Sequence, residues 1–335
     1  MKRSPALQKI LKNKINDRVL GDDRSDGINR VLGENKSTIS QIILEKGRTD
    51  FRQPSHGYSA AEKVLLYSYF NMKTHIDTCK SVLEKQKHIS DKILDDNLHI
   101  YDIGCGPFTV GLAFADLFKN QIFDYTCIDN SDEMLKMGRK LWKHSSNEGL
   151  IDSNVRQVSH NHWDSINTGA NQNKNVLFTF SYFFATKQLN DADIKSLARV
   201  VKSISKKAKG SVYLLHINSS YGPANTNYLK FMDELGFEPN LKSSNNSVYE
   251  FVKLSVGSSN LGSNSDIDYA KRIEGIRKVY ANAYNKWTEE EEISLVRDFN
   301  LGITCINTLS NRFSRQPSAI ESRLIKLNLL DQDAA

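Results

Sequence analysis

Residues 98–117, LHIYDIGCGPFTVGLAFADL, predict a strand, a glycine turn and a helix in direct succession. Residues 98–101 are a short run of large side chains typical of a buried strand, and the apolar residues of 110–118 recur at helical spacing. A strand, a tight glycine turn and a helix together form the opening unit of a doubly wound nucleotide-binding sheet. The stretch therefore predicts an α/β fold built on a parallel sheet.

The two glycines of the turn, Gly104 and Gly106, allow a sharp turn and let the backbone approach a ligand without a Cβ in the way. The N–H groups at the start of the following helix favour an anionic ligand group. A dinucleotide-binding G-x-G-x-x-G fingerprint would have a third glycine where this chain has Thr109. The fingerprint therefore lacks its last element, which argues against a nicotinamide dinucleotide.

The run Asp-Ile-Gly-Cys-Gly-Pro at 102–107 resembles motif I of class I S-adenosylmethionine (SAM)-dependent methyltransferases. The resemblance implies a Rossmann-like, doubly wound methyltransferase sheet. It also implies that the backbone of Gly104, Cys105 and Gly106 holds the methionine part of SAM. Asp102 would then contact the amino group of the cofactor, directly or through water.

A second strand-like run, 123–128, ends at Asp129, with Asn130 next to it. The distance from the glycine turn leaves room for one helix and a turn, as a right-handed crossover requires. The resemblance implies that Asp129 binds the ribose hydroxyls of SAM and that Asn130 lies in the same site. Met134, on the next predicted helix, is the kind of residue that packs against an adenine ring.

A third predicted strand, 154–159, leads into the run His-Asn-His-Trp-Asp at 160–164. The family usually contacts the adenine from this position. We therefore expect Asn161 or His162 to hydrogen-bond the adenine, or Trp163 to stack on it. The two histidines of the run have no visible partner ligands, so no metal site is predicted.

The predicted central strand 175–180 ends in Ser-Tyr-Phe-Phe at 181–184, where the family brings substrate and methyl donor together. The Asp/Asn-Pro-Pro-aromatic sequence of amino-methylating nucleic-acid enzymes is absent, and no cysteine for cytosine-C5 chemistry lies near this strand. Ser181 and Tyr182 either line the acceptor pocket or only pack beside it. Methyl transfer from a sulfonium requires mainly alignment and desolvation, so no catalytic residue is assigned.

The chain is expected to divide into four parts. These are a helical N-terminal region (1–97), the methyltransferase domain (98–255), a Gly/Ser/Asn-rich linker (256–270) and a helix-turn-helix-like domain (271–330). In the N-terminal region, Ser59 and Glu62 predict a capping box at the start of a helix over 60–82. Aromatic residues there either close the cofactor cleft or pack in the core: Tyr58, Tyr67, Tyr69 and Phe70.

The C-terminal run that begins with Trp287 resembles Myb/SANT-like helix-turn-helix domains, through W-T-x-E-E-E and then L-S-x-R-F-x-R-x-P-S-A-I-x-S-R-L. Within it, Thr288 and Glu291 predict a capping box at the start of a helix. The resemblance implies three short helices, of which the third enters the major groove of DNA. The candidate contacts to nucleic acid are Arg315, Ser318, Ser322, Arg323 and Lys326. The alternative is a small trihelical module that binds a protein.

The net charge of +6 is concentrated in the N- and C-terminal parts, where the basic side chains either contact an anion such as nucleic acid or form solvated helix faces. No apolar run approaches the length of a membrane span, and the four scattered cysteines indicate a reduced, cytoplasmic protein. We expect a SAM-dependent methyltransferase recruited to DNA or RNA by its C-terminal domain. Two alternatives remain: a methyltransferase of a protein or small molecule with a partner-docking domain, and a non-catalytic SAM-binding regulator.

Overall fold

The computed structural model describes residues 2–26, 28–94, 98–119, 121–167, 174–220, 222–244, 247–254, 277–282, 285, 287–327 and 329–330. The chain forms two compact units, Met1–Gly257 and Ser258–Ala335, and each is described by itself. The predicted linker 256–270 lies outside the described residues.

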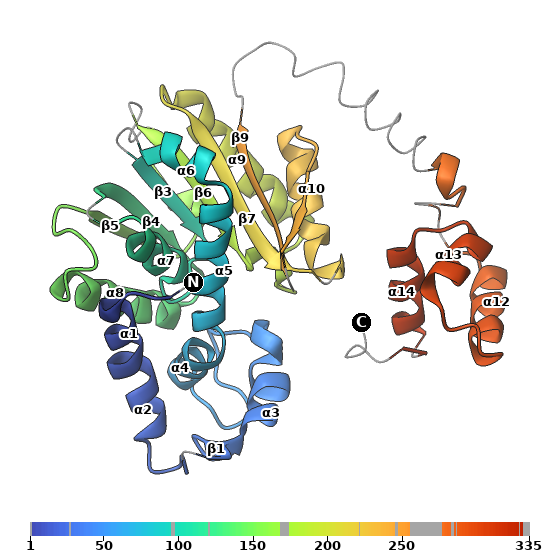
Figure 1. The fold of residues 1–335 in the computed structure, drawn as a ribbon, viewed down its shortest axis with the longest axis horizontal. Helices are drawn as coiled ribbons and strands as arrows, with labels where there is room; N and C mark the ends of the chain where they lie inside the picture. Colours follow the sequence, from blue (N-terminus) through green and yellow to red (C-terminus); the bar gives the residue numbers. More distant parts are fainter. Residues whose placement is uncertain are drawn as a thin grey trace. The chain divides into compact units, whose positions relative to one another are not determined.

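The first unit is built on a seven-stranded sheet with the order β5-β4-β3-β6-β7-β9-β8 (Figure 1). The strands are β3 (Leu98–Ile103), β4 (Phe123–Ile128), β5 (Arg156–His160), β6 (Asn175–Ser181), β7 (Val212–Ser219), β8 (Lys242–Ser244) and β9 (Ser247–Leu254). Strands β3 to β7 are parallel to their neighbours, whereas β9 runs antiparallel to both β7 and β8. The predicted Rossmann-like methyltransferase sheet is thereby confirmed.

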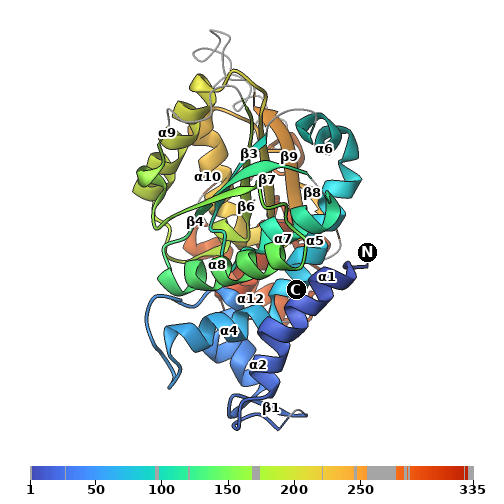
Figure 2. The same ribbon diagram turned by 90° about the vertical axis from the view of Figure 1, so that its left-hand side faces the viewer.

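Helices cover both faces of this sheet (Figures 1 and 2). The helices of the first unit are α1 (Pro5–Leu11), α2 (Asp17–Leu20), α3 (Lys36–Thr38), α4 (Ala60–Phe70), α5 (Met72–Lys85), α6 (Lys87–Leu94), α7 (Thr109–Leu117), α8 (Asp132–Asn147), α9 (Asp191–Lys207) and α10 (Thr226–Leu235). Side chains alternate across β3, so Ile100 joins the core beneath α5, α7 and α8, and Tyr101 joins the core beneath α9 and α10. All six residues of β3 are buried, as expected for the central strand of a parallel sheet.

The shorter elements of the first unit are a two-stranded hairpin and a set of single helical turns. The hairpin pairs β1 (Arg30–Val31) with β2 (Glu34–Asn35). The turns are η1 (Lys12–Asn16), η2 (Ile39–Ile43), η3 (Glu45–Gly47), η4 (Trp163–Ser165), η5 (Phe183–Ala185) and η6 (Gly222–Asn225).

The N-terminal helices pack on the same unit, with α1 and α4 both against α8. The predicted capping box is present, because the Ser59 hydroxyl accepts from the Glu62 N–H and the Glu62 carboxylate accepts from the Ser59 N–H. The helix predicted over 60–82 is divided at Asn71 into α4 and α5. Tyr58 packs in the core, where its hydroxyl donates to the Leu32 carbonyl at 2.7 Å.

The second unit contains α12 (Glu289–Asn300), α13 (Ile306–Phe313) and α14 (Pro317–Lys326). Its helices enclose a small core of buried apolar side chains: Leu295, Leu309, Phe313, Ile320 and Leu324. Thr288 caps α12 in a capping box with Glu291, as its sequence predicts.

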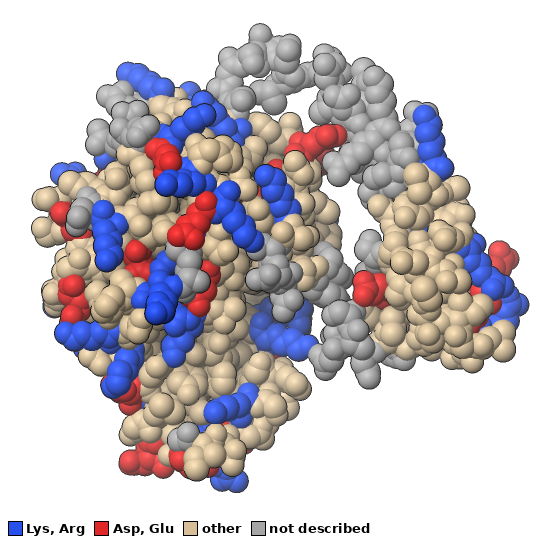
Figure 3. All heavy atoms as spheres, in the orientation of Figure 1, with Lys and Arg blue, Asp and Glu red and all other residues tan. Residues whose placement is uncertain are grey.

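Among the described residues, the helices are all too short or too polar to cross a lipid bilayer. On the face of the first unit seen in Figure 3, basic side chains are interspersed with acidic ones. The basic surplus of the N-terminal part is therefore not gathered into one continuous patch on that face.

Candidate functional site

The glycine turn lies where the carboxyl ends of β3 and β4 meet. The N–H groups of Gly104 and Cys105 both donate to the Ile128 carbonyl, at 2.8 and 3.0 Å, and fix the turn against the end of β4. Both Gly104 and Gly106 have left-handed backbone angles, with φ of 70° and 53°. The Cys105 side chain is buried, and burial raises the pKa of its thiol, so it is neutral and serves as an apolar side chain.

The two glycines have different surroundings. A Cβ on Gly104 would lie 2.5 Å from Cδ2 of Phe183, so the ring of Phe183 requires a glycine at this position. A Cβ on Gly106 would first meet the sulfur of Met134, at 4.0 Å. The backbone of Gly106 therefore leaves room beside buried Met134 for a ligand to approach.

Asp129 follows β4 and faces the glycine turn. Its carboxylate accepts from the Gly106 N–H at 3.0 Å and from the Ser131 N–H at 2.9 Å, with one oxygen for each donor. A carboxylate has about four acceptor positions, so each oxygen keeps capacity for a further donor such as a hydroxyl. Burial raises the pKa of Asp129 to about 6, against the lowering effect of the two N–H donors. Asn130, next to it, is exposed.

Asp102 departs from the expectation that it contacts a ligand. Its side chain is fully buried, and its two oxygens accept from the hydroxyls of Tyr125 and Thr179. In register, Asp102 lies between Cys127 of β4 and Thr179 of β6, beneath the glycine turn. Burial raises the pKa of Asp102 to about 6. The Asp102 carboxylate therefore links β3 to β4 and β6 by hydrogen bonds and lies directly beneath the glycine turn.

The residues that follow β5 lie in two places: some are near the surface, and Trp163 packs on the side of the sheet covered by α9. Asn161 donates to the Asp132 carboxylate at 2.5 Å, in the first turn of α8. The His162 ring lies 4.0 Å from the Trp163 ring, and its Nδ1 accepts from the Asp164 N–H. Trp163 itself is buried, and its indole N–H donates to Ser196 of α9. The structure thus leaves Asn161 and His162 near the surface and makes Trp163 a packing residue.

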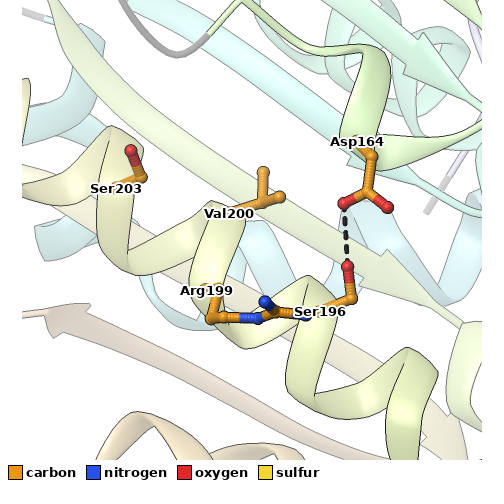
Figure 4. A pocket seen from close by; sticks show the side chains of 5 residues that line it. All are labelled: Asp164, Ser196, Arg199, Val200 and Ser203. Atoms are coloured by element: carbon orange, nitrogen blue, oxygen red, sulfur yellow. Dashed lines mark hydrogen bonds between the residues drawn. The ribbon is translucent and has the colours of Figure 1, made fainter.

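A surface hollow of about 380 Å³ lies between η4 and α9 (Figure 4). Its lining residues are Asp164, Ser196, Arg199, Val200 and Ser203. The Ser196 hydroxyl donates to Asp164 at 2.8 Å across the hollow. Its lining includes none of the residues predicted for the cofactor site.

The end of β6 carries the two residues expected at the acceptor side. Ser181 pairs with Ile217 in the sheet and is half-buried. Tyr182 has a left-handed backbone, with φ of 59°, and its N–H donates to the Ile217 carbonyl at 2.7 Å. Its ring stacks on His75 of α5, with ring centres 3.8 Å apart and planes 15° apart. Its hydroxyl lies 3.3 Å from the Ser247 hydroxyl.

Residues of the N-terminal region pack beside the edge of the sheet formed by the carboxyl ends of its parallel strands. The Phe51 carbonyl accepts from the Ser131 hydroxyl at 3.0 Å, and the Phe51 ring packs edge-on to Tyr67 at 5.2 Å. Burial is the main cause that raises the pKa of Tyr67, and Tyr182 and Asp129 add smaller contributions. Lys187, beyond β6, pairs with Glu45 at 3.0 Å.

Two N-terminal residues at this edge of the sheet, Phe51 and His75, were not predicted from the sequence. The available signal was the position of His75 eight residues after Tyr67, close to the same face of one helical run. The pairing of His75 with Tyr182 joins distant segments and leaves no local trace. Of the other aromatics considered, Tyr69 and Phe70 pack edge-on against each other at 5.0 Å.

The chain is similar to known proteins in its structure and not in its sequence. The sequence matches no protein-family model, and no curated protein sequence is similar to it. A SAM-dependent methyltransferase from Aquifex aeolicus aligns with 56% of this chain and 100% of its own, at 15% identity and a TM-score of 0.36. A precorrin-6y C5,15-methyltransferase from Geobacter metallireducens aligns with 51% of this chain and 87% of its own, at 17% identity and a TM-score of 0.32.

A SAM-dependent methyltransferase from Leishmania major aligns with 64% of this chain and 91% of its own, at 10% identity and a TM-score of 0.37. At such identities and TM-scores, the assignment of the fold rests on the strand order and directions given above. The chemistry has to be argued from the site itself.

Arg315, in the second unit, is a correction to the predicted nucleic-acid contacts. Its side chain is buried, where it pairs with Glu291 at 2.8 Å, donates to the Asn285 carbonyl at 2.8 Å and stacks on Trp287 at 4.2 Å. The tryptophan and the glutamate of the capping box together hold this guanidinium inside the domain. Arg315 is therefore a packing residue and is not available to a phosphate.

Arg323 is also engaged within the unit, because it forms an ion pair with Glu292 and lies 5.5 Å from the Trp287 ring. The side chains of Ser318 and Ser322 lie outside the described part of the structure. Among the described side chains of the five candidates, Lys326 is the exposed one.

Among the described residues, no three or more His, Cys, Asp or Glu side chains lie together in a group that could hold a metal ion.

Proposed function

We propose that this protein is a SAM-dependent methyltransferase. The observation that carries the proposal is the juxtaposition of an open glycine backbone at Gly106 with the carboxylate of Asp129, at the carboxyl ends of β3 and β4. Doubly wound sheets bind their ligands in the crevice at this edge. A carboxylate with acceptor capacity left over suits two vicinal hydroxyls, such as those of a ribose.

The residues present fit SAM. The backbone of Cys105 and Gly106 would border its methionine part, Asp129 would accept from its ribose, and buried Met134 would pack against its adenine. SAM supplies a methyl group on a sulfonium, which is already a good leaving group. This chain then has to align the acceptor and exclude water. Such positioning lowers the activation barrier by about 7–11 kcal/mol in favourable cases. Asp102 would contribute as a positioning residue through the turn above it.

Asp129→Ala should lower the affinity for SAM by about 100-fold or more, because two charge-assisted hydrogen bonds to the ribose are lost. Isothermal titration calorimetry measures the change directly. The matched control is Asp233→Ala, which removes an exposed carboxylate from α10 and should leave the affinity as it is. A folded wild-type protein that takes up no SAM would overturn the proposal.

The affinity for SAM should also fall on acidification. With its pKa raised from 3.8 to about 6, Asp129 is ionised at neutral pH and gains a proton as the pH drops through 6. The bound ribose favours the ionised carboxylate, so the affinity should decline about tenfold between pH 7 and pH 5. In Asp129→Asn the affinity should be weaker and nearly independent of pH. If the variant kept the wild-type pH profile, the titrating group would be another one.

The C-terminal unit is proposed to bring the enzyme to nucleic acid through α14. The support is its resemblance to Myb/SANT-like domains and the exposed charge of Lys326. Arg323 of α14 pairs with Glu292, and Arg315, just before this helix, pairs with Glu291. These ion pairs reduce the positive charge that α14 and its N-terminal turn offer, so docking of a protein partner is the second candidate.

Affinity for duplex DNA, measured by fluorescence anisotropy over a salt series, distinguishes these candidates. Each phosphate contact gives a slope of about −0.9 in log K against log salt, and Lys326→Ala should reduce the slope by about 1. Lys278→Ala removes an exposed charge elsewhere in the unit and should change it less. Equal effects of the two substitutions would count against α14, and an absence of salt-dependent binding would favour the protein partner.

A non-catalytic regulator would bind SAM without transferring its methyl group. Transfer of a labelled methyl group to nucleic acid, protein or small-molecule acceptors separates the enzyme from the regulator and also identifies the acceptor class. A cytoplasmic location remains part of the proposal.

A further inference from the structure

A cluster of partly exposed rings lies beside the proposed cofactor site. We call it the ring cluster and define it as Phe51, Tyr67, His75 and Tyr182. Phe51 packs edge-on to Tyr67 at 5.2 Å, and the Tyr67 hydroxyl shares a hydrogen bond of 3.2 Å with Nδ1 of His75. His75 stacks on Tyr182 at 3.8 Å. The rings come from three separate segments and meet at the edge of the sheet where substrates bind.

The ring cluster differs from ordinary core packing. The core on this face of the sheet consists mainly of aliphatic side chains that are almost fully buried, whereas Phe51, Tyr67 and Tyr182 are partly exposed and pack at its margin. Tyr182 also adopts a left-handed backbone that a non-glycine residue takes up only at an energetic cost. The hydrogen bond from its N–H to Ile217 and the stack on His75 hold it there.

The chemistry of the ring cluster selects its ligand. Burial lowers the pKa of His75 to about 4 and raises that of Tyr67, so both side chains are neutral near pH 7. The ring cluster is linked to Asp129, assigned above to the ribose, through Ser131. The Ser131 hydroxyl donates to the Phe51 carbonyl at 3.0 Å, and the Ser131 N–H donates to Asp129 at 2.9 Å. Flat neutral faces with hydrogen-bonding edges suit a planar ring, which gains a stacking area that a flexible aliphatic chain does not have.

Resting on the proposed methyl transfer, we propose that the ring cluster is the acceptor subsite and that it takes a planar aromatic ring. The rings of Tyr182 and His75 stack on each other, and the ring of the acceptor stacks against the partly exposed side of this pair. Tyr67 holds His75 in orientation through their hydrogen bond. A nucleobase and a phenolic ring share this chemistry.

The test measures ring binding with the cofactor pocket filled. Full-length protein saturated with S-adenosylhomocysteine is titrated with guanosine, cytidine and catechol, and with putrescine as a non-aromatic probe, by saturation-transfer NMR. We expect at least one ring probe to bind and putrescine not to bind. Tyr182→Leu and, independently, His75→Leu should weaken binding of that ring about tenfold, the usual scale of one lost ring stack.

Tyr69→Leu is the matched control, because Tyr69 is a partly exposed aromatic of the same N-terminal region that contacts Phe70 and lies outside the ring cluster. It should leave ring binding unchanged. Circular dichroism and the affinity for S-adenosylhomocysteine report whether each variant is folded. Since two substitutions on different elements are used, loss of folding in one leaves the other to decide.

The outcomes separate the two proposals. Binding of nucleosides alone identifies a nucleobase acceptor, and binding of catechol alone identifies a phenolic one. Binding of no ring probe, or binding that survives both leucine substitutions, overturns the ring subsite even if the cofactor binds. If the wild type binds no S-adenosylhomocysteine, the methyltransferase proposal fails, and the same titrations without cofactor still decide whether the ring cluster binds a ring.

Discussion

Replacing Gly104 with alanine should lower the free energy of unfolding by about 2–5 kcal/mol and abolish binding of SAM. Two costs add up. An alanine in a left-handed conformation costs about 1–2 kcal/mol, and Gly104 has a φ of 70°. Its Cβ would also lie 2.5 Å from Phe183, and such overpacking costs about 1–3 kcal/mol. Relief of this clash would displace either the glycine turn or Phe183, and both border the proposed cofactor site.

Gly149→Ala is the matched control. Gly149 has nearly the same φ, 67°, but its Cβ would meet no described atom within 4 Å, so only the backbone cost remains. Urea unfolding of the two variants should therefore differ by the packing cost. In the double variant Gly104→Ala/Phe183→Ala, part of the loss should be recovered relative to the sum of the single substitutions. Equal losses at Gly104 and Gly149 would show that contact with Phe183 is not what requires the glycine.

The parts of the fold that could be predicted are those with a local signature. A glycine turn after a buried strand and Asp129 after the next strand identified the sheet, because strand, turn and crossover follow one another within a short span. The capping boxes at Ser59 and Thr288 also depend on residues only three positions apart. The break at Asn71 lacks such a signal, since asparagine is tolerated within helices.

The parts of the candidate site that could not be predicted depend on contacts between distant segments. Asp102 can be buried because hydroxyls on the two neighbouring strands, those of Tyr125 and Thr179, donate to its carboxylate. Arg315 is not a surface cation because it forms an ion pair with Glu291. The sequence predicted a role for Glu291 only in the helix cap. A residue type indicates which interactions a side chain can make. Its actual partner depends on how distant segments pack in the folded chain.

Lys80→Met should destabilise the first unit by about 3–5 kcal/mol, the usual cost of leaving one partner of a buried ion pair alone. Lys80 of α5 pairs with Asp116 of α7, and their side chains are 3% and 0% exposed. Asp116 also accepts from the Ser4 N–H at 3.1 Å, and Lys80 donates to the Lys2 carbonyl at 3.2 Å. The pair thereby fastens the start of the chain to two helices, and its loss should also free the N-terminal segment.

Lys9→Met tests the same change at the surface, where Lys9 pairs with Glu148 at 2.8 Å and is 58% exposed. Such a pair is worth about 0–1 kcal/mol, so urea unfolding should barely change. The double variant Lys80→Met/Asp116→Leu should be less destabilised than Lys80→Met, because no uncompensated buried charge remains. Hydrogen exchange should report faster opening of α1 in Lys80→Met. A Lys80→Met protein as stable as Lys9→Met would mean that Asp116 finds water or another donor, and that the start of the chain is held by its apolar contacts.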